Sequence, residues 1–253
     1  MALLIYDGSF TGLLTSIFHG FATKCCPADI VKEVHYQASL LDQSIFIEAD
    51  EVKAERVLKG VDARSGHVGS KMIYKMFLSE LPGVELTIYR LVSLLVQKNA
   101  YAVLDNYAND IVRYSHHVVK MINREVHRMH ALVRFQQLPN GYYQAIIQPD
   151  FDVLPLIGDH FLRRYADQPW MIVDSSRRYG LVYDLHKLGY IEVEEAAGNG
   201  TAVAVPDTTH EDLYQQLWKQ YFHAVNIKER KNTKLHLRHL PRRYWKYLVE
   251  KQL

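Results

Sequence analysis

The stretch Arg113–Phe135 constrains this chain most, because its hydrophobic pattern changes period part-way along. Apolar residues recur at helical spacing as far as about Met129. They predict a long amphipathic helix that begins at Asn106 or Asn109, since either side chain can cap a first turn. From Ala131 onward apolar and polar residues follow a shorter period, which predicts a change from helix to strand.

The segment after this helix predicts a β-hairpin. Two strand-like runs, Ala131–Leu138 and Tyr142–Gln148, flank the turn Pro139-Asn140-Gly141. The Asn-Gly dipeptide favours the tight turn that joins antiparallel strands. Arg134 then falls within the first strand among apolar neighbours, where a buried guanidinium needs a partner.

The remaining elements predict an α+β fold with an antiparallel sheet. A helical stretch at about 50–129 separates early strands from late strands, and the basic C-terminus is expected to be helical. Ser9 is a suitable N-cap for a helix through Phe21. We expect one α+β domain over residues 1–253. Strands are expected at 2–6, 30–35, 44–48, 170–173, 179–183, 190–193 and 201–205, and a further helix from Thr208 or Thr209 through Phe222.

Charge is concentrated at one end of the chain. The net charge is +2 overall, yet residues 226–253 hold nine Lys or Arg against two Asp or Glu. A basic segment of this kind favours an acidic partner, most simply a phosphate backbone. A solvated helical face explains the same charge equally well.

The cysteines and the apolar runs predict a cytoplasmic protein without a membrane segment. Cys25 and Cys26 are the only cysteines, and vicinal thiols of this kind are expected to be reduced. No apolar run approaches the roughly 20 residues of a membrane span. His127/His130 and His236/His239 are spaced one helical turn apart, but no acidic residue accompanies either pair at ligand spacing, so no metal and no cofactor are expected.

Basic and aromatic residues carry the strongest functional pattern. A helix at 109–129 places Arg113, His117, Lys120, Arg124 and His127 along one face, as a phosphate-binding helix would. Near the C-terminus, cations alternate with rings that either stack on bases or dock the segment onto the body. The nucleic-acid-binding candidates are Arg113, Lys120, Arg124, His127, Arg128, Arg134, Arg242, Arg243, Tyr244 and Trp245.

The acidic residues near this helix do not form an obvious catalytic pair. Glu125 and His127 point in directions about 200° apart on a helix, so they are not expected to meet. We expect Glu125 to pair with an arginine from another element. Asp150 and Asp152 precede a helix, and capping explains at least one of them, with Asp152 the expected cap.

Three ordered stretches resemble one bacterial family. They are Tyr6–Phe18, Arg124–Phe135, and Leu217–Phe222 followed by Leu240–Leu248. The family comprises DNA metabolism and DNA repair proteins that contain a domain of unknown function. The resemblance implies a partnership with a radical SAM protein of DNA modification or repair. In related proteins a similar domain is fused to a uracil-DNA-glycosylase-like domain. With two cysteines, this chain cannot hold the partner's iron–sulfur cluster itself.

The pattern and the resemblance together lead to one main hypothesis. The chain is expected to be a nucleic-acid-binding accessory protein of a DNA repair or modification system that acts with the radical SAM partner. One alternative is an adaptor that docks on that partner without touching DNA. Another is an enzyme that acts on a nucleobase or nucleotide, for which Glu125 and His127 would have to converge in a pocket.

Overall fold

A computed structural model describes residues 2–38, 43–96, 103–193, 237, 239–248 and 251. The chain divides into two compact units, Met1–Ile122 and Asn123–Leu253. The single domain expected from the sequence stays a prediction. The strand and helix expected at 201–205 and 209–222, and most of the basic segment 226–253, lie outside the described residues.

The first unit contains a three-stranded sheet of order β2-β1-β3. Its strands are β1 (Leu3–Tyr6), β2 (Asp29–Lys32) and β3 (Ser44–Ile47), and both pairings are parallel. The predicted antiparallel sheet is therefore wrong here. The physical reason is the connection: α1 (Phe10–Ala22) lies between β1 and β2, and a helical crossover returns the chain to the same end of the sheet.

Helices supply most of the first unit. They are α1, α2 (Glu51–Ser65), α3 (His67–Phe77), α4 (Val84–Leu95) and the short 3₁₀ helix η1 (Glu33–His35). Ser9 caps α1 as predicted, because its Oγ accepts a hydrogen bond of 2.8 Å from the Gly12 N–H. Asp50 caps α2 in the same way through the Lys53 N–H at 3.0 Å. The predicted helices from 50 to 95 are confirmed.

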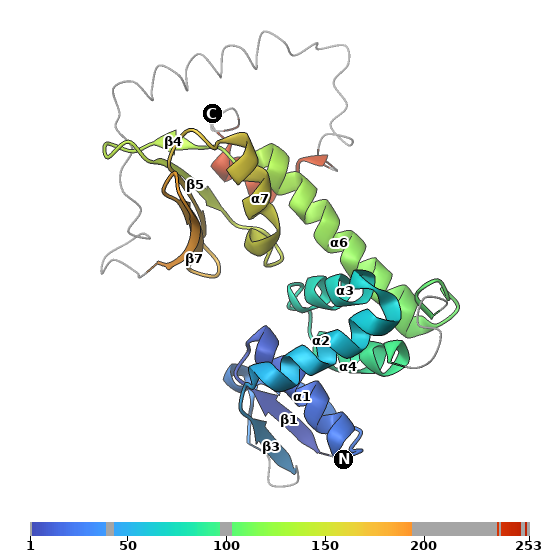
Figure 1. Ribbon diagram of the computed structural model, residues 1–253. Helices are drawn as coiled ribbons and strands as arrows, with labels where there is room; N and C mark the ends of the chain where they lie inside the picture. The colour runs from blue at the N-terminus through green and yellow to red at the C-terminus, as the bar shows by residue number, and fades with distance from the viewer. Residues whose placement is uncertain are drawn as a thin grey trace. The chain divides into compact units, whose positions relative to one another are not determined.

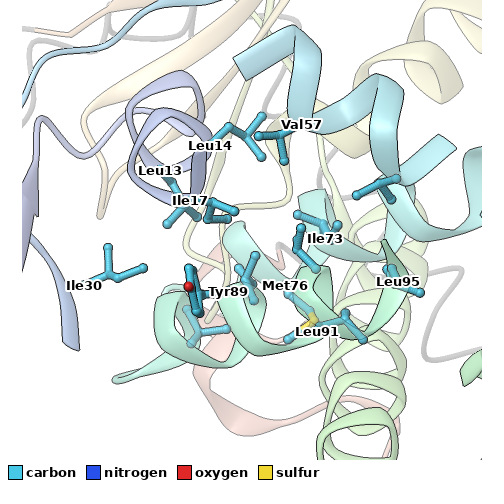
Figure 2. Packing of buried hydrophobic residues seen from close by; sticks show 14 of the residues in the cluster. Leu13, Leu14, Ile17, Ile30, Val57, Ile73, Met76, Tyr89, Leu91 and Leu95 are labelled. Carbon is cyan, nitrogen blue, oxygen red and sulfur yellow. The ribbon is translucent and has the colours of Figure 1, made fainter. Parts of the chain in front are cut away.

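The core of the first unit forms where these helices pack together and against the sheet. Apolar side chains recur on each helix at spacings of three and four residues, which gives each helix one buried face. Figure 2 shows side chains of α1, α2, α3 and α4 meeting in this core. The labelled members are Leu13, Leu14, Ile17, Ile30, Val57, Ile73, Met76, Tyr89, Leu91 and Leu95.

The long helix α6 (Asp110–Leu132) begins in the first unit and ends in the second. Asn109 caps it, as predicted: its Oδ1 accepts hydrogen bonds from the N–H groups of Ile111 at 2.9 Å and Val112 at 3.3 Å. The buried residues of α6 recur at helical spacing and are Val112, Ser115, Val118, Ile122, Glu125 and Met129. A carboxylate thus occupies a position in the buried row.

The second unit contains a five-stranded sheet of order β4-β5-β6-β7-β8. The strands are β4 (Gln136–Gln137), β5 (Tyr143–Ile147), β6 (Trp170–Asp174), β7 (Tyr179–Tyr183) and β8 (Leu188–Glu192). β5 and β6 run parallel, whereas the other pairings are antiparallel, so the sheet is mixed. Helix α7 (Leu154–Arg164) connects β5 to β6, which again explains the parallel pair. Figure 1 shows α7 beside this sheet.

The predicted hairpin is present with a shorter first strand. β4 pairs with β5 across the turn that contains Gly141, whose φ is 84°. Arg134 does not lie in a strand, which corrects the prediction, because α6 continues through Leu132. The Arg134 guanidinium instead donates to the Ala131 carbonyl at 2.8 Å. It therefore satisfies a backbone group that the end of the helix leaves open.

The described C-terminal residues form the 3₁₀ helix η3 (Arg242–Tyr247). Tyr244 and Leu248 are buried, so of the two alternatives for this segment, docking onto the body holds for these two side chains. Trp245 is half-buried, and its indole N–H donates to the Leu240 carbonyl at 3.1 Å. Within the described ranges, no helix combines the length and apolar character that crossing a membrane requires.

Candidate nucleic-acid interface

Glu125 is the centre of a polar network within the second unit. Its side chain is 1% exposed. Oε1 accepts hydrogen bonds from the Tyr244 hydroxyl and from the Asp150 N–H, the latter at 3.0 Å. Oε2 accepts from Arg128 Nη1 at 3.1 Å and Arg243 Nη2 at 3.4 Å. The prediction that Glu125 pairs with an arginine from another element is confirmed by Arg243.

Arg243 links the same network to a second carboxylate. Its Nη2 lies 2.6 Å from Asp150 Oδ2 and donates to the Tyr244 hydroxyl at 2.7 Å. Two arginines thus face two carboxylates, and their charges balance. We call the five residues Glu125, Arg128, Asp150, Arg243 and Tyr244 the Glu125 network.

Protonation in the network is fixed by burial and by neighbouring charge. Burial raises the pKa of the Tyr244 phenol, and the hydrogen bond to Glu125 raises it further. Tyr244 therefore stays protonated and donates to the carboxylate. Burial lowers the pKa of Arg243, but Tyr244, Asp150 and Glu125 outweigh this effect and raise it on balance. The guanidinium stays charged.

A second buried ion pair holds the loop that carries Asp150. Asp174 is fully buried and accepts hydrogen bonds from the Ser176 N–H at 2.9 Å and from Arg177 Nη1 at 2.8 Å. Arg177 also donates to the carbonyls of Pro149 at 3.4 Å and Asp150 at 3.3 Å. The two sites adjoin because β5 and β6 are parallel and end at the same edge of the sheet.

Beside the network lies a hollow that is too small for a nucleobase. Its volume is about 10 Å³, which is room for about one water molecule. It is lined by Met129, Leu132, Ile146, Ile147, Gln148, Tyr244 and Tyr247. Among the described residues, those around the network therefore form a packed polar contact beside a hollow of about one water molecule.

Removing the Tyr244 hydroxyl is expected to destabilise the second unit measurably. Tyr244→Phe deletes the donor to a buried carboxylate, and hydrogen bonds to charged groups contribute about 2 kcal/mol. The loss is measured as a lower midpoint of urea unfolding. The hydrogen exchange of the β5 amides reports the unfolding of this unit. Tyr190→Phe is the matched control because Tyr190 is 63% exposed. Equal stability of the two variants would contradict the assigned role.

The structure separates the predicted cations of the second unit into two groups. Arg128 and Arg243 lie in the Glu125 network and are neutralised there. Arg124, His127 and Arg242 are exposed. Within the part of the chain that the structure describes, these three side chains form no ion pair. Arg242 lies over the Trp245 ring, 5.9 Å from its centroid.

The predicted cations on the first half of α6 are also exposed. Arg113 pairs with Asp110 at 2.5 Å, one turn earlier on the same helix. His117 and Lys120 are exposed as the helical face predicted. The row predicted from the sequence is thus on the helix surface, with Arg113 partly neutralised.

Glu125 and His127 are not brought together. Glu125 is buried, whereas His127 is exposed on α6. The structure thus offers no converging acid and base at this pair. Among the described residues, His, Cys, Asp and Glu do not gather in groups of three or more suited to a metal ion. His236 lies outside that range.

The ion pairs of Asp150, Asp174 and Arg177 are not predicted from the sequence. Capping is expected for at least one of Asp150 and Asp152, but the Asp150 carboxylate pairs with Arg243. Asp152 does not cap α7 either: that helix has no side-chain cap, and Asp152 accepts the Tyr179 hydroxyl hydrogen bond. A clue was present for Arg177, since Asp174 stands three residues before it at a strand end.

A family model described as a domain of unknown function, DUF4130, matches residues 82–250. The chain belongs to this family. A comparison with curated proteins found no match. The DUF4130 segment includes α4, α6, the mixed sheet and η3. Every member of the Glu125 network therefore falls within it.

Proposed function

We propose that this DUF4130 protein binds nucleic acid through the exposed cations of α6 and of the C-terminal segment. The observation that carries the proposal is the contrast within the predicted cations. Arg128 and Arg243 are held by carboxylates, whereas Arg124 and Arg242, which immediately precede Glu125 and Arg243, are exposed. Cations without an acidic partner are those that phosphate groups can engage at least cost.

The Glu125 network supports this proposal by fixing the two cationic segments to each other. Tyr244 and Arg243 of η3 both bond to Glu125 of α6. Arg242 is thereby tied to the helix that carries Arg124 and His127. A binding surface assembled before the ligand arrives loses less conformational entropy on binding. The buried carboxylate thus organises the surface without contacting the ligand.

The biological setting of the proposal comes from the resemblance to DNA metabolism and repair proteins. We propose an accessory protein of a DNA repair or modification system that acts with a radical SAM partner. The half-buried Trp245 ring packs against two cations, Arg242 at 5.9 Å and Lys251 at 5.4 Å from the ring centroid, so the C-terminal segment presents aromatic and basic side chains together. An adaptor that binds the partner but not DNA is the competing outcome of the experiment below.

The double variant Arg124→Ala/Arg242→Ala is expected to weaken DNA binding and its salt dependence. Each lost phosphate contact lowers the slope of log affinity against log salt by about 0.9, so the slope should fall by about 2. Affinity at moderate salt should fall at least about tenfold. Fluorescence anisotropy with labelled single- and double-stranded DNA over a salt series measures both quantities.

Lys53→Ala/Lys59→Ala is the matched control, since it removes two exposed cations from α2. It should leave the salt slope within error of the unmodified protein. Wild-type protein that fails to bind either DNA at low salt would overturn direct contact. Co-purification with the radical SAM partner in that case would support the adaptor.

A further inference from the structure

Two histidines from different helices stack face to face in the second unit. The ring centroids of His130 on α6 and His160 on α7 lie 4.0 Å apart, with 15° between the planes. Phe161 meets the His160 ring edge-on at 5.1 Å. The stack places α6 and α7 side by side at this level. Cations on both helices can therefore contribute to one surface.

The surroundings of this pair are cationic. His127 lies one turn earlier on α6, and Arg163 and Arg164 lie in the last turn of α7. All three side chains are exposed. Over the described ranges, neither arginine forms an ion pair. Arg134 follows α6 and binds the Ala131 carbonyl.

Acidic residues do not balance this charge. Asp159 precedes His160, but its charge acts on Tyr190 of β8, whose pKa is raised by burial first and then by Asp152 and Asp159. Asp167 follows α7 and is exposed. Neither Asp159 nor Asp167 pairs with Arg163 or Arg164 in the described part of the chain. Among the described residues, Arg163 and Arg164 are therefore exposed cations that no carboxylate pairs with directly.

This environment keeps both imidazoles neutral near pH 7. Burial lowers the pKa of His130, and the His160 and His127 charges lower it further. Burial also lowers the pKa of His160, together with Arg164 and Arg163. The His130 Nε2 atom is buried and has no hydrogen-bond partner within the structure. The stacked pair is thus kept unprotonated by burial first and by nearby positive charge second.

We propose that the surface around the stacked imidazoles, formed by His127, Arg163 and Arg164, binds the phosphate backbone of nucleic acid, and that one imidazole takes up a proton when it does. This inference rests on the proposed function and extends the interface to α7. Phosphates bring negative charge close to the imidazoles, which opposes the part of the pKa depression that Arg163 and Arg164 cause at His160. Only one ring takes a proton from solvent, because two charges at this separation repel strongly.

Isothermal titration calorimetry of duplex DNA in buffers of different ionisation enthalpy measures the proton uptake directly. At about pH 7 binding should be accompanied by net uptake of less than about one proton per site. Affinity should rise as pH falls from about 8 to about 6. The double variant His130→Phe/His160→Phe, which keeps two stacked rings, should abolish most of the uptake. Each single variant leaves one imidazole and should therefore retain part of the uptake.

Two further variants separate the contributions. His127→Gln removes the exposed imidazole, so any uptake that remains comes from the stacked pair. Arg163→Ala/Arg164→Ala should weaken binding about tenfold and lower the salt slope by about 2. Lys53→Ala/Lys59→Ala is again the control with equal charge removed. Arg163 and Arg164 lie on α7, and Lys53 and Lys59 lie on α2.

The outcomes distinguish this inference from the proposed function. Protein that binds DNA at no pH or salt concentration overturns both. Salt-dependent binding with equal proton uptake in wild type and in His130→Phe/His160→Phe overturns the proton linkage alone. Unchanged affinity in Arg163→Ala/Arg164→Ala shows that α7 takes no part, while binding through α6 and η3 stands.

Discussion

Replacing Glu125 with alanine is expected to lower the free energy of unfolding of the second unit by about 3–4 kcal/mol. The change leaves the Tyr244 hydroxyl and the Asp150 N–H without their acceptor, and it removes the anion shared by Arg128 and Arg243. Breaking a buried charge pair from one side is costly because the other side stays desolvated. The two arginines are 27% and 40% exposed, so water offsets part of the loss.

Hydrogen exchange of the β5 and β6 amides under native conditions measures this loss in the unit concerned. Glu125→Gln keeps the shape of the side chain and one hydrogen-bond acceptor but removes the charge. The free energy of unfolding of this variant should therefore lie between those of the wild type and Glu125→Ala. Glu192→Ala is the control, because Glu192 is an exposed acid at the end of β8. Equal exchange rates in Glu125→Ala and Glu192→Ala would show that Glu125 does not stabilise the second unit.

Replacing Leu91 with alanine is expected to destabilise the first unit by about 3 kcal/mol. Leu91 is fully buried on α4 and packs in the core shown in Figure 2. Truncation removes buried methyl groups and leaves a cavity that the surrounding helices fill only in part. The loss should be largest in the amides of α1, α3 and α4.

Native-state hydrogen exchange over the same helices measures the effect. Val52→Ala, at a position that is 69% exposed on α2, should change stability by less than about 0.5 kcal/mol. Comparable exchange in both variants would mean that the cluster around Leu91 does not hold the unit together. Measuring β5 and β6 in Leu91→Ala also reports how far the two units unfold together.

The helices could be predicted from sequence because their signals are local. Ser9 and Asn109 mark the starts of α1 and α6 through hydrogen bonds within three residues. The buried row of α6 follows its apolar spacing. Even the pairing of Glu125 with a distant arginine could be expected, since a carboxylate so close to apolar positions needs a cation.

Strand direction could not be predicted from the strands alone, because period and burial do not encode it. The signal that was present lies in the connections. α1 separates β1 from β2, and α7 separates β5 from β6. A strand, a helix and a strand in succession favour a parallel pair. This rule gives the observed parallel pairing for both β1–β2 and β5–β6.

The sequence predicts which residues belong to the candidate site, but it does not predict which of them form ion pairs. A sequence shows how many cations a segment holds, but not which of them meet a carboxylate in the fold. Arg128 and Arg243 resemble Arg124 and Arg242 in sequence, yet the first two are neutralised by Glu125 and Asp150. The Tyr244–Glu125 contact joins residues 119 positions apart. Only the folded chain decides which arginines stay available.

The same separation imposes an order on folding during synthesis. The nascent chain carries Glu125 out of the ribosome well before Arg243 and Tyr244, which follow 118 and 119 residues later. Until then the carboxylate has only Arg128 and the Asp150 N–H as partners among those described, and α6 holds an incompletely satisfied charge in its apolar row. The second unit is therefore expected to reach its full stability only after η3 has been synthesised and has docked on Glu125.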